Sequence, residues 1–323
     1  MLVRINLFLL LFYSFTLISV AQGNIKILVF SKTSVYRHAS IEKGIEAIDN
    51  FKDQYNFEPS FTEDANAFTP ENLESFAVVV FLNTTGDVLN NSQQEAFEEF
   101  IRAGKGFVGI HSATDTEYDW PFYGEMIGRY FKNHPHIQSA SVLIEKDHAS
   151  TSHLPEEWTR TDEWYNFKPS LSPDLEVLLS VDESTYSGGE MGDKHPVSWI
   201  NEYEGGRIFY TAMGHTEESY TEENFLKHIA EGILWASGKE VTSIEDPVFA
   251  EPVKVFPNPV QNFLFIHSPS PIIRLSICTK DGKEIENYPV QTKKIDVGSY
   301  SPGNYFLLME YPFKRIIIKF IKN

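Results

Sequence analysis

Candidate strands alternate with candidate helices through the first third of the chain. The strand candidates are Ile25–Ser31, Asn56–Thr62, Phe76–Leu82 and Lys105–Ile110. The helix candidates between them are Ser40–Tyr55, a short helix begun by Thr69-Pro70, and Gln93–Ala103 opened by Ser92. Mostly apolar strands that alternate with helices are typical of a parallel sheet covered on both sides. The pattern therefore predicts an α/β fold with an open, mostly parallel sheet and helices on both faces.

The remainder of the chain contains a second kind of structure. Further strands and one helix are predicted at Ile137–Lys146, Leu175–Val181, His195–Asn201, Gly206–Thr211 and Glu222–Ala236. A polar, acidic and proline-containing segment follows, and it is typical of a linker. Short strands separated by turns then continue to the end, which predicts a small all-β sandwich of about 70 residues. The expected bounds are 22–240 for the α/β domain, 241–252 for the linker and 253–323 for the sandwich.

The N-terminal segment has the pattern of a signal peptide. Arg4 precedes an apolar run from Ile5 to Val20, and small residues end it at Ala21. We expect cleavage after Ala21, so that residues 1–21 are removed. A membrane anchor is the alternative, although the run is slightly short to span a bilayer. No later segment is long and apolar enough to cross a membrane, so the mature protein is expected to have no membrane span.

Composition excludes several functions. The chain carries 27 basic and 45 acidic residues, a net charge of −18. Such a surface repels nucleic acid and anionic membranes, and it favours a neutral substrate over an anionic one. Cys278 is the single cysteine. An intrachain disulfide, a cysteine-based zinc site and a cysteine nucleophile in the α/β domain are therefore excluded.

Three histidines follow predicted strands. His38 comes after the first strand, His111 ends Lys105–Ile110, and His215 follows Gly206–Thr211. Ligands of open α/β sheets bind outside the carboxyl ends of the strands, so we expect these histidines to meet. His111 is also flanked two places away on each side by the small residues Gly109 and Ala113, which is the spacing of a nucleophile elbow. Such an elbow is strained, and strained turns cluster at working sites.

Polar and aromatic residues near these histidines suit a saccharide, because carboxylates bind hydroxyls and aromatic rings stack on the apolar sugar face. The residues expected to line the pocket are His38, Asp115, His134, His195 and Trp199.

Acid–base chemistry is the predicted mechanism. Imidazole titrates near neutral pH, so His111 and His215 are predicted to shuttle protons. Asp162 or Glu163 would orient a histidine or bind hydroxyls. A hydrolase with Ser112 as nucleophile is disfavoured, since Ser112 lies one place beyond the centre of the elbow.

A divalent metal is a second possibility for the same residues. Sites for zinc, manganese or iron need three or more histidine or carboxylate ligands. The sequence has no local signature of such a site, and the pair His134 and His136 alone is weak. The metal ligands are therefore not assigned from the sequence.

The α/β region resembles the ThuA-like, or trehalose-utilisation, family. The stretches that carry the resemblance are Lys26–Phe30 with Arg37-His38, GKGFVGIHSATD (Gly104–Asp115), DEWYNF (Asp162–Phe167), HPVSW (His195–Trp199) and GRIFYTAMGH (Gly206–His215). The resemblance implies a class I glutamine amidotransferase-like fold and a role in the catabolism of disaccharides, with a link to 3-keto sugars. That fold normally has a cysteine at the elbow, whereas this chain has His111, so glutamine hydrolysis is ruled out.

The C-terminal region resembles the sorting domain of the type IX secretion system. The motif is Val255-Phe256-Pro257-Asn258-Pro259, followed by Asp281-Gly282-Lys283, Gly303-Asn304-Tyr305 and the basic end Lys314–Lys322. The resemblance implies a partnership with the secretion machinery, and release or attachment at the cell surface.

The combined prediction is an exported saccharide-processing enzyme that uses acid–base chemistry. The alternatives are a non-catalytic carbohydrate-binding protein of the cell surface and a metal-dependent hydrolase on the same scaffold.

Overall fold

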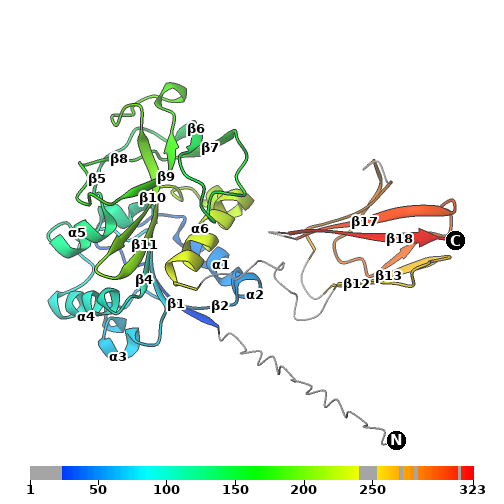
Figure 1. Cartoon of the computed structure of the whole chain (residues 1–323), viewed down its shortest axis with the longest axis horizontal. Coiled ribbons are helices and arrows are strands. Elements are labelled where there is room, and N and C mark those ends of the chain that lie inside the picture. The colour runs from blue at the N-terminus through cyan, green and yellow to red at the C-terminus, as the bar shows by residue number, and fades with distance from the viewer. Residues whose placement is uncertain (1–23, 240–252, 269–271, 280–282, 312–313) are drawn as a thin grey trace, which may run out of the picture.

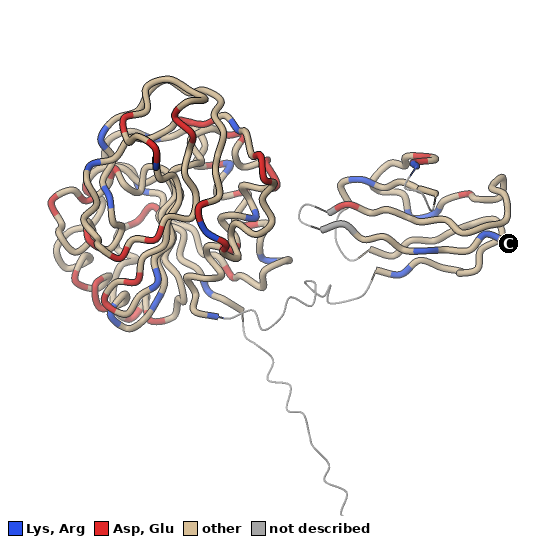
Figure 2. The backbone as a smooth tube through the Cα atoms, turned by 45° about the horizontal axis from the view of Figure 1, so that its top comes forward, with Lys and Arg blue, Asp and Glu red and all other residues tan. Residues whose placement is uncertain are grey.

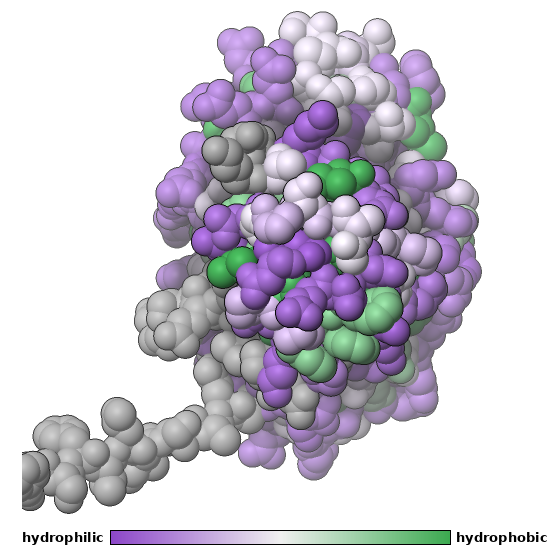
Figure 3. Space-filling model, turned by 90° about the vertical axis from the view of Figure 1, so that its right-hand side faces the viewer, coloured by the Kyte–Doolittle hydropathy of each residue, from purple (hydrophilic) through white to green (hydrophobic). Residues whose placement is uncertain are grey.

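A computed structural model of the chain describes residues 24–239, 253–268, 272–279, 283–311 and 314–323. The predicted signal peptide (1–21) and the predicted linker (241–252) lie outside the described residues. No helix among the described residues is long and apolar enough to cross a membrane. The face in Figure 3 is largely hydrophilic, and its apolar residues form small separate groups.

A nine-stranded sheet organises the first region, in the order β2-β1-β3-β4-β11-β10-β9-β6-β7. The parallel part consists of β2 (Phe57–Thr62), β1 (Ile25–Phe30), β3 (Val78–Leu82), β4 (Gly106–Ile110) and β11 (Gly206–Thr211). The antiparallel part consists of β10 (His195–Tyr203), β9 (Glu176–Val181), β6 (Gln138–Ile144) and β7 (Trp158–Asp162). The predicted α/β class is confirmed. A small separate pair, β5 (Phe131–Asn133) and β8 (Asn166–Phe167), accompanies the sheet.

Helices cover both faces of this sheet (Figure 1). On one side lie α3 (Pro70–Leu73), α4 (Asn91–Arg102) and α5 (Pro121–Ile127). On the other lie α1 (Ile41–Asn50), α2 (Lys52–Tyr55) and α6 (Glu223–Ala236). Short 3₁₀ turns complete the region: η1 (Ala65–Ala67), η2 (His111–Asp115), η3 (Glu183–Thr185) and η4 (Glu217–Thr221).

Two of the predicted helices differ in their bounds. The helix expected at Ser40–Tyr55 is two helices, α1 and α2, with Phe51 between them. Ser92 does not open α4, because the helix begins one residue earlier and Asn90 is its N-cap. The Asn90 side chain accepts a hydrogen bond from the Gln93 N–H, and the Gln93 side chain accepts one from the Asn90 N–H. This reciprocal capping box satisfies two donors that a helix end leaves open.

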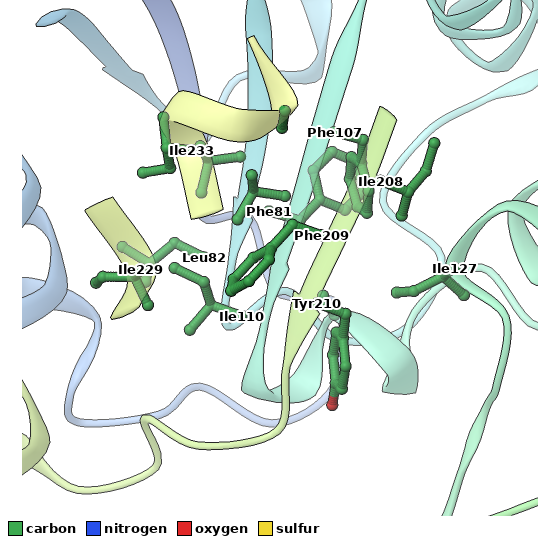
Figure 4. Close-up of a cluster of buried hydrophobic side chains, with 14 of the residues drawn as sticks. Phe81, Leu82, Phe107, Ile110, Ile127, Ile208, Phe209, Tyr210, Ile229 and Ile233 are labelled. Carbon is green, nitrogen blue, oxygen red and sulfur yellow. The ribbon is translucent and has the colours of Figure 1, made fainter. Parts of the chain in front are cut away.

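The hydrophobic core lies on both sides of the central strands. Figure 4 shows the part around Phe81, Phe107 and Phe209, which are fully buried. Helix α6 approaches β11 very closely at Gly232, where a Cβ atom would lie 2.5 Å from the ring of Phe209. The close contact fixes the position of β11, and therefore of the loop that follows it.

The second region is a β-sandwich with a core of its own. One sheet has the order β12-β13-β16 and the other β15-β14-β17-β18. Their bounds are β12 (Lys254–Phe256), β13 (Phe263–His267), β14 (Arg274–Cys278), β15 (Glu284–Tyr288), β16 (Lys294–Asp296), β17 (Gly303–Tyr311) and β18 (Lys314–Lys322). The predicted all-β sandwich is confirmed. Sequence reasoning missed β15, whose EIENY sequence has no buried residue to mark it as a strand.

Charge is distributed unevenly between the two regions. From Val253 to Asn323 the sequence has ten basic and five acidic residues, although the whole chain has a net charge of −18. The excess of acidic residues therefore belongs to the first region, where they are spread over helices and loops (Figure 2). A strongly acidic surface there repels anionic molecules.

Candidate functional site

His111 stands at a strained turn directly after β4. Its φ of 50° lies in the left-handed region, which few residues other than glycine adopt. The small flanking residues make the turn possible, since a Cβ atom at Gly109 would lie 3.1 Å from Ala113 Cβ and 3.0 Å from the Tyr210 ring. The turn continues into η2 rather than into a longer helix. The elbow geometry predicted from the spacing is present, and it presents an imidazole.

The backbone fixes the tautomer of His111. Its Nδ1 lies 2.7 Å from the carbonyl oxygen of Ala212. A carbonyl oxygen only accepts hydrogen bonds, so Nδ1 carries the hydrogen and Nε2 presents a lone pair. Nε2 lies 3.1 Å from His215 Nδ1 and 3.6 Å from Glu163 Oε2. The ring of Tyr165 packs against the imidazole, with the ring centroids 4.3 Å apart.

His215 is held in place by the buried carboxylate of Asp162. This carboxylate accepts hydrogen bonds from the backbone N–H groups of Gly214 and His215, at 2.9 and 3.1 Å. It also forms an ion pair with the buried Arg160, at 2.9 Å. The contacts of Asp162 are therefore directed to the loop after β11 and to a structural cation. They favour a role in orienting His215.

Glu163 connects the buried histidines to the surface. Its Oε2 lies 3.1 Å from His215 Nδ1, and its Oε1 lies 3.0 Å from Nδ1 of the exposed His134. Burial alone would raise the pKa of Glu163, but the neighbouring His111 and His215, in their protonated forms, outweigh burial and hold the pKa below its ordinary value. Glu163 is therefore ionised at neutral pH.

His38 completes the group from the loop after β1. Its ring meets those of His111 and His215 edge to face, with centroids 4.8 and 5.1 Å apart. Its Nδ1 lies 3.4 Å from the hydroxyl oxygen of Ser112. Burial, followed by the positive charges that His111 and His215 carry when protonated, lowers the pKa of His38 to about 2. The imidazole of His38 is therefore neutral at physiological pH.

These four side chains, His38, His111, Glu163 and His215, form what we call the His–Glu centre. One ligand atom from each lies within 4.8 Å of the others. The three histidines follow β1, β4 and β11, which run parallel, so their carboxyl ends lie on the same edge of the sheet. The spacing of the four atoms is suitable for one cation.

Asp115 and His134 lie beside the His–Glu centre. His134 is exposed and contacts Glu163, as described above. Asp115 is half-buried, and its carboxylate accepts a hydrogen bond of 2.7 Å from the Tyr118 hydroxyl. Burial raises the pKa of Asp115, against the opposing effects of Tyr118 and His111. These two residues are placed where polar contacts to a bound molecule could form.

The structure does not bring His195 and Trp199 into the centre. Both are fully buried. His195 Nε2 donates to the carbonyl oxygen of Tyr165 at 2.7 Å, and its Nδ1 lies 2.9 Å from both Tyr186 and Glu183. The Trp199 indole donates to the carbonyl oxygen of Ile127 at 2.8 Å. Their contacts are those of structural residues, and His195 supports the segment that carries Glu163.

Arg160 was not identified from the sequence as part of the site, and Tyr165 was noted only as an aromatic neighbour of the Asp162–Glu163 pair. Tyr165 packs on His111, and Arg160 neutralises Asp162 in the interior. The signal for Tyr165 was its place in the DEWYNF stretch beside Glu163. Arg160 gives no such signal, because the alternating sequence of β7 reads as an exposed polar segment.

Comparison with known proteins identifies the family. Residues 26–236, well over half of the chain, match the family described as trehalose utilisation, ThuA. The chain belongs to the ThuA family. A ThuA-like protein from Bacteroides uniformis has a similar structure, with a TM-score of 0.58, 22% identity, and coverage of 70% of this chain and 96% of that one. A ThuA-like protein from Parabacteroides merdae has a TM-score of 0.58 at 18% identity, with 71% and 96% covered.

These likenesses show the fold of the ThuA domain, which is the predicted open, mostly parallel sheet with helices on both faces (Figure 1). No curated protein matches the chain. Residues 254–323 match a secretion system C-terminal sorting domain. The sorting domain indicates export through the type IX secretion system, to the cell surface or beyond it.

Proposed function

We propose that the ThuA domain is an exported enzyme of carbohydrate catabolism that acts on a neutral saccharide at the His–Glu centre. The substrate class is a trehalose-type disaccharide or a 3-keto sugar derived from one. The observation that carries the proposal is the convergence of His38, His111, Glu163 and His215 at the carboxyl edge of the parallel strands. Buried, mutually contacting titratable groups at that edge are typical of catalytic sites.

The geometry supports polarisation of a carbonyl or glycosidic oxygen, with proton transfer nearby. The side chain of His215 is 17% exposed and that of His134 is 41% exposed, whereas His111 is fully buried. A substrate would therefore approach from the side of His215 and His134. Asp115 and His134 would hydrogen-bond its hydroxyls, and Asp162 would keep His215 in place. In the acid–base version of the reaction, His111 and His215 move the proton and Glu163 stabilises the imidazolium.

The acidic surface supports the same substrate class. A chain with a net charge of −18 repels phosphorylated sugars and sugar acids, and it does not repel a neutral disaccharide. Export by the sorting domain is consistent with a saccharide met outside the cell.

The test is product formation by the full chain on a panel of disaccharides and their 3-keto derivatives, followed by chromatography. We expect turnover of at least one neutral member, and a loss of about 100-fold or more in Glu163→Gln. His148→Ala is the matched control, because His148 contacts Ser150 and Trp235 and lies outside the centre. Saturable sugar binding without any product would reject the enzyme and favour the carbohydrate-binding alternative.

A further inference from the structure

We propose that the His–Glu centre binds one divalent transition-metal ion, with His38, His111 and His215 as nitrogen ligands and Glu163 as the oxygen ligand. The inference deepens the proposed function, since it places a Lewis acid at the same centre. The metal site is tested by measuring metal binding directly, and this measurement needs no saccharide.

Hydrogen-bond accounting at the centre is the first argument. The hydrogen of His111 is on Nδ1, where the Ala212 carbonyl holds it. Nε2 therefore faces the centre as an acceptor, opposite the acceptor Glu163 Oε2 at 3.6 Å. A hydrogen on His215 Nδ1, which lies 3.1 Å from each of these atoms, cannot bond strongly to both at once. A cation between the three atoms would satisfy all of them.

The distances agree with a shared ion. Zinc–ligand bonds of about 2.1 Å place neighbouring ligand atoms about 3.0 to 3.5 Å apart in octahedral or tetrahedral geometry. The separations of 3.1 Å and 3.6 Å between His215, Glu163 and His111 fall in or next to this range. His38 lies somewhat further out, because the four atoms spread over up to 4.8 Å. Binding would therefore draw His38 slightly inward.

Neighbouring groups already orient two of the ligands. The Ala212 carbonyl holds His111 by the nitrogen that faces away from the centre. Oε1 of Glu163 lies 3.0 Å from His134 Nδ1, on the outer side, and Oε2 is the oxygen directed toward His111 and His215. Metal sites commonly use such outer hydrogen bonds to fix the tautomer and direction of their ligands. In addition, Asp162 fixes the backbone of His215.

The ligand set selects the class of metal. Three imidazoles and one carboxylate, without sulfur, suit zinc, manganese, iron, cobalt or nickel. Calcium and magnesium prefer oxygen ligands, so they fit poorly. Coordination positions that the protein leaves free would face the solvent side of the centre, where the exposed His134 lies. A carbonyl or hydroxyl oxygen of the saccharide could bind there and be polarised by the ion.

The experiment measures metal content and affinity in the full chain. Protein purified without chelators is analysed for elements, and we expect about one transition-metal ion per chain. The ion is then removed with a chelator, and Zn²⁺, Mn²⁺ and Co²⁺ are titrated back by calorimetry. His38→Gln and His215→Ala should each weaken binding by at least about tenfold, with circular dichroism confirming that they fold. His148→Ala should leave the affinity unchanged.

The outcomes separate this inference from the proposed function. If none of the three ions binds the stripped protein with defined stoichiometry, or if His38→Gln and His215→Ala bind like the unmodified chain, the metal site is rejected. A bound ion that responds to both variants, without turnover of any saccharide, supports the metal site and rejects the substrate class. Saccharide turnover that survives complete metal removal rejects the Lewis-acid role and supports the acid–base version.

Discussion

At the residue scale, the site depends on where a few polar side chains are directed. His111 faces the centre because its Nδ1 is held by Ala212 and its backbone is left-handed. Glu163 and Asp162 are consecutive residues with different surroundings: Glu163 contacts the histidines of the centre, whereas Asp162 faces the backbone and Arg160. Adjacent carboxylates thus have separate tasks.

Removal of the Asp162 charge should destabilise the protein and disturb the centre together. Asp162→Ala leaves Arg160 without its buried partner and leaves the N–H groups of Gly214 and His215 without an acceptor. We expect a loss of about 3 kcal/mol or more in the free energy of unfolding, measured by urea denaturation. Asp115→Asn is the control, since an amide oxygen can still accept from Tyr118, and it should unfold almost like the unmodified chain. Equal stability of the two variants would show that Asp162 is not a structural anchor.

The limits of sequence reasoning are clearest at this scale. Positions after predicted strands located His38, His111 and His215, because the carboxyl ends of parallel strands share one edge. The polar and aromatic composition of the HPVSW stretch grouped His195 and Trp199 with them. Their burial and their partners are set by β10, which extends the sheet away from the parallel strands. Such non-local packing leaves no local pattern in a single sequence.

At the element scale, buried strands could be predicted from the sequence, whereas polar strands and the exact start of a helix could not. Mostly apolar strands such as β3 and β4 were recognisable, because every residue in them is buried. The polar strands β7 and β15 were missed, because alternating or charged residues resemble loops. Helix α4 was found, but its N-terminus was placed at Ser92 although Asn90 makes the reciprocal cap.

The cap of α4 can be tested with neighbouring substitutions. Asn90→Ala removes the acceptor for the Gln93 N–H and should cost about 1 kcal/mol of stability. Ser92→Ala removes only a hydrogen bond to the Asn90 side chain, so its effect should be clearly smaller. Thermal denaturation followed by circular dichroism compares the variants. A larger loss in Ser92→Ala would contradict the capping box.

Helix α6 carries a histidine that should make the fold sensitive to acid. His228 is fully buried, and burial is the main cause that lowers its pKa from 6.5 to about 3. Above pH 6.5 the imidazole is neutral in both the folded and unfolded states. Below it the unfolded chain binds a proton that the folded chain excludes until about pH 3, so stability decreases as the pH falls through this window.

The decrease due to His228 should be about 1.4 kcal/mol per pH unit, or about 2 kcal/mol between pH 6.5 and 5. His228→Gln should lower stability at neutral pH, because its packing changes, and should also flatten the slope below pH 6.5. Urea denaturation at several pH values measures both effects. The exposed His136→Gln is the control, and an identical slope in both variants would argue against His228 as a source of acid sensitivity.

At the scale of the whole molecule, the buried apolar residues form two separate clusters, one in the ThuA domain and one in the sorting domain. Phe209 is fully buried in the first, and Leu264 is fully buried in the second. Because each domain has its own core, we expect the ThuA domain and the sorting domain to unfold in separate cooperative transitions.

Calorimetry of the full chain should therefore show two unfolding transitions. Phe209→Ala should lower the midpoint of one, and Leu264→Ala the midpoint of the other, since each leaves a cavity worth about 2 to 5 kcal/mol in its own core. A single transition that both variants shift equally would mean that the regions unfold as one unit.

The turn at His111 has a consequence for how a site of this kind can change its chemistry in evolution. The backbone at position 111 is left-handed, and the small residues Gly109 and Ala113 leave room for this tight turn. The turn directs the side chain at position 111 into the site, whatever that side chain is. Replacement at this single position would therefore exchange a nitrogen donor for a thiol, a hydroxyl or a carboxylate without rebuilding the fold. The turn keeps the side chain of residue 111 at the same place in the site, and the identity of that residue decides between covalent and coordination chemistry.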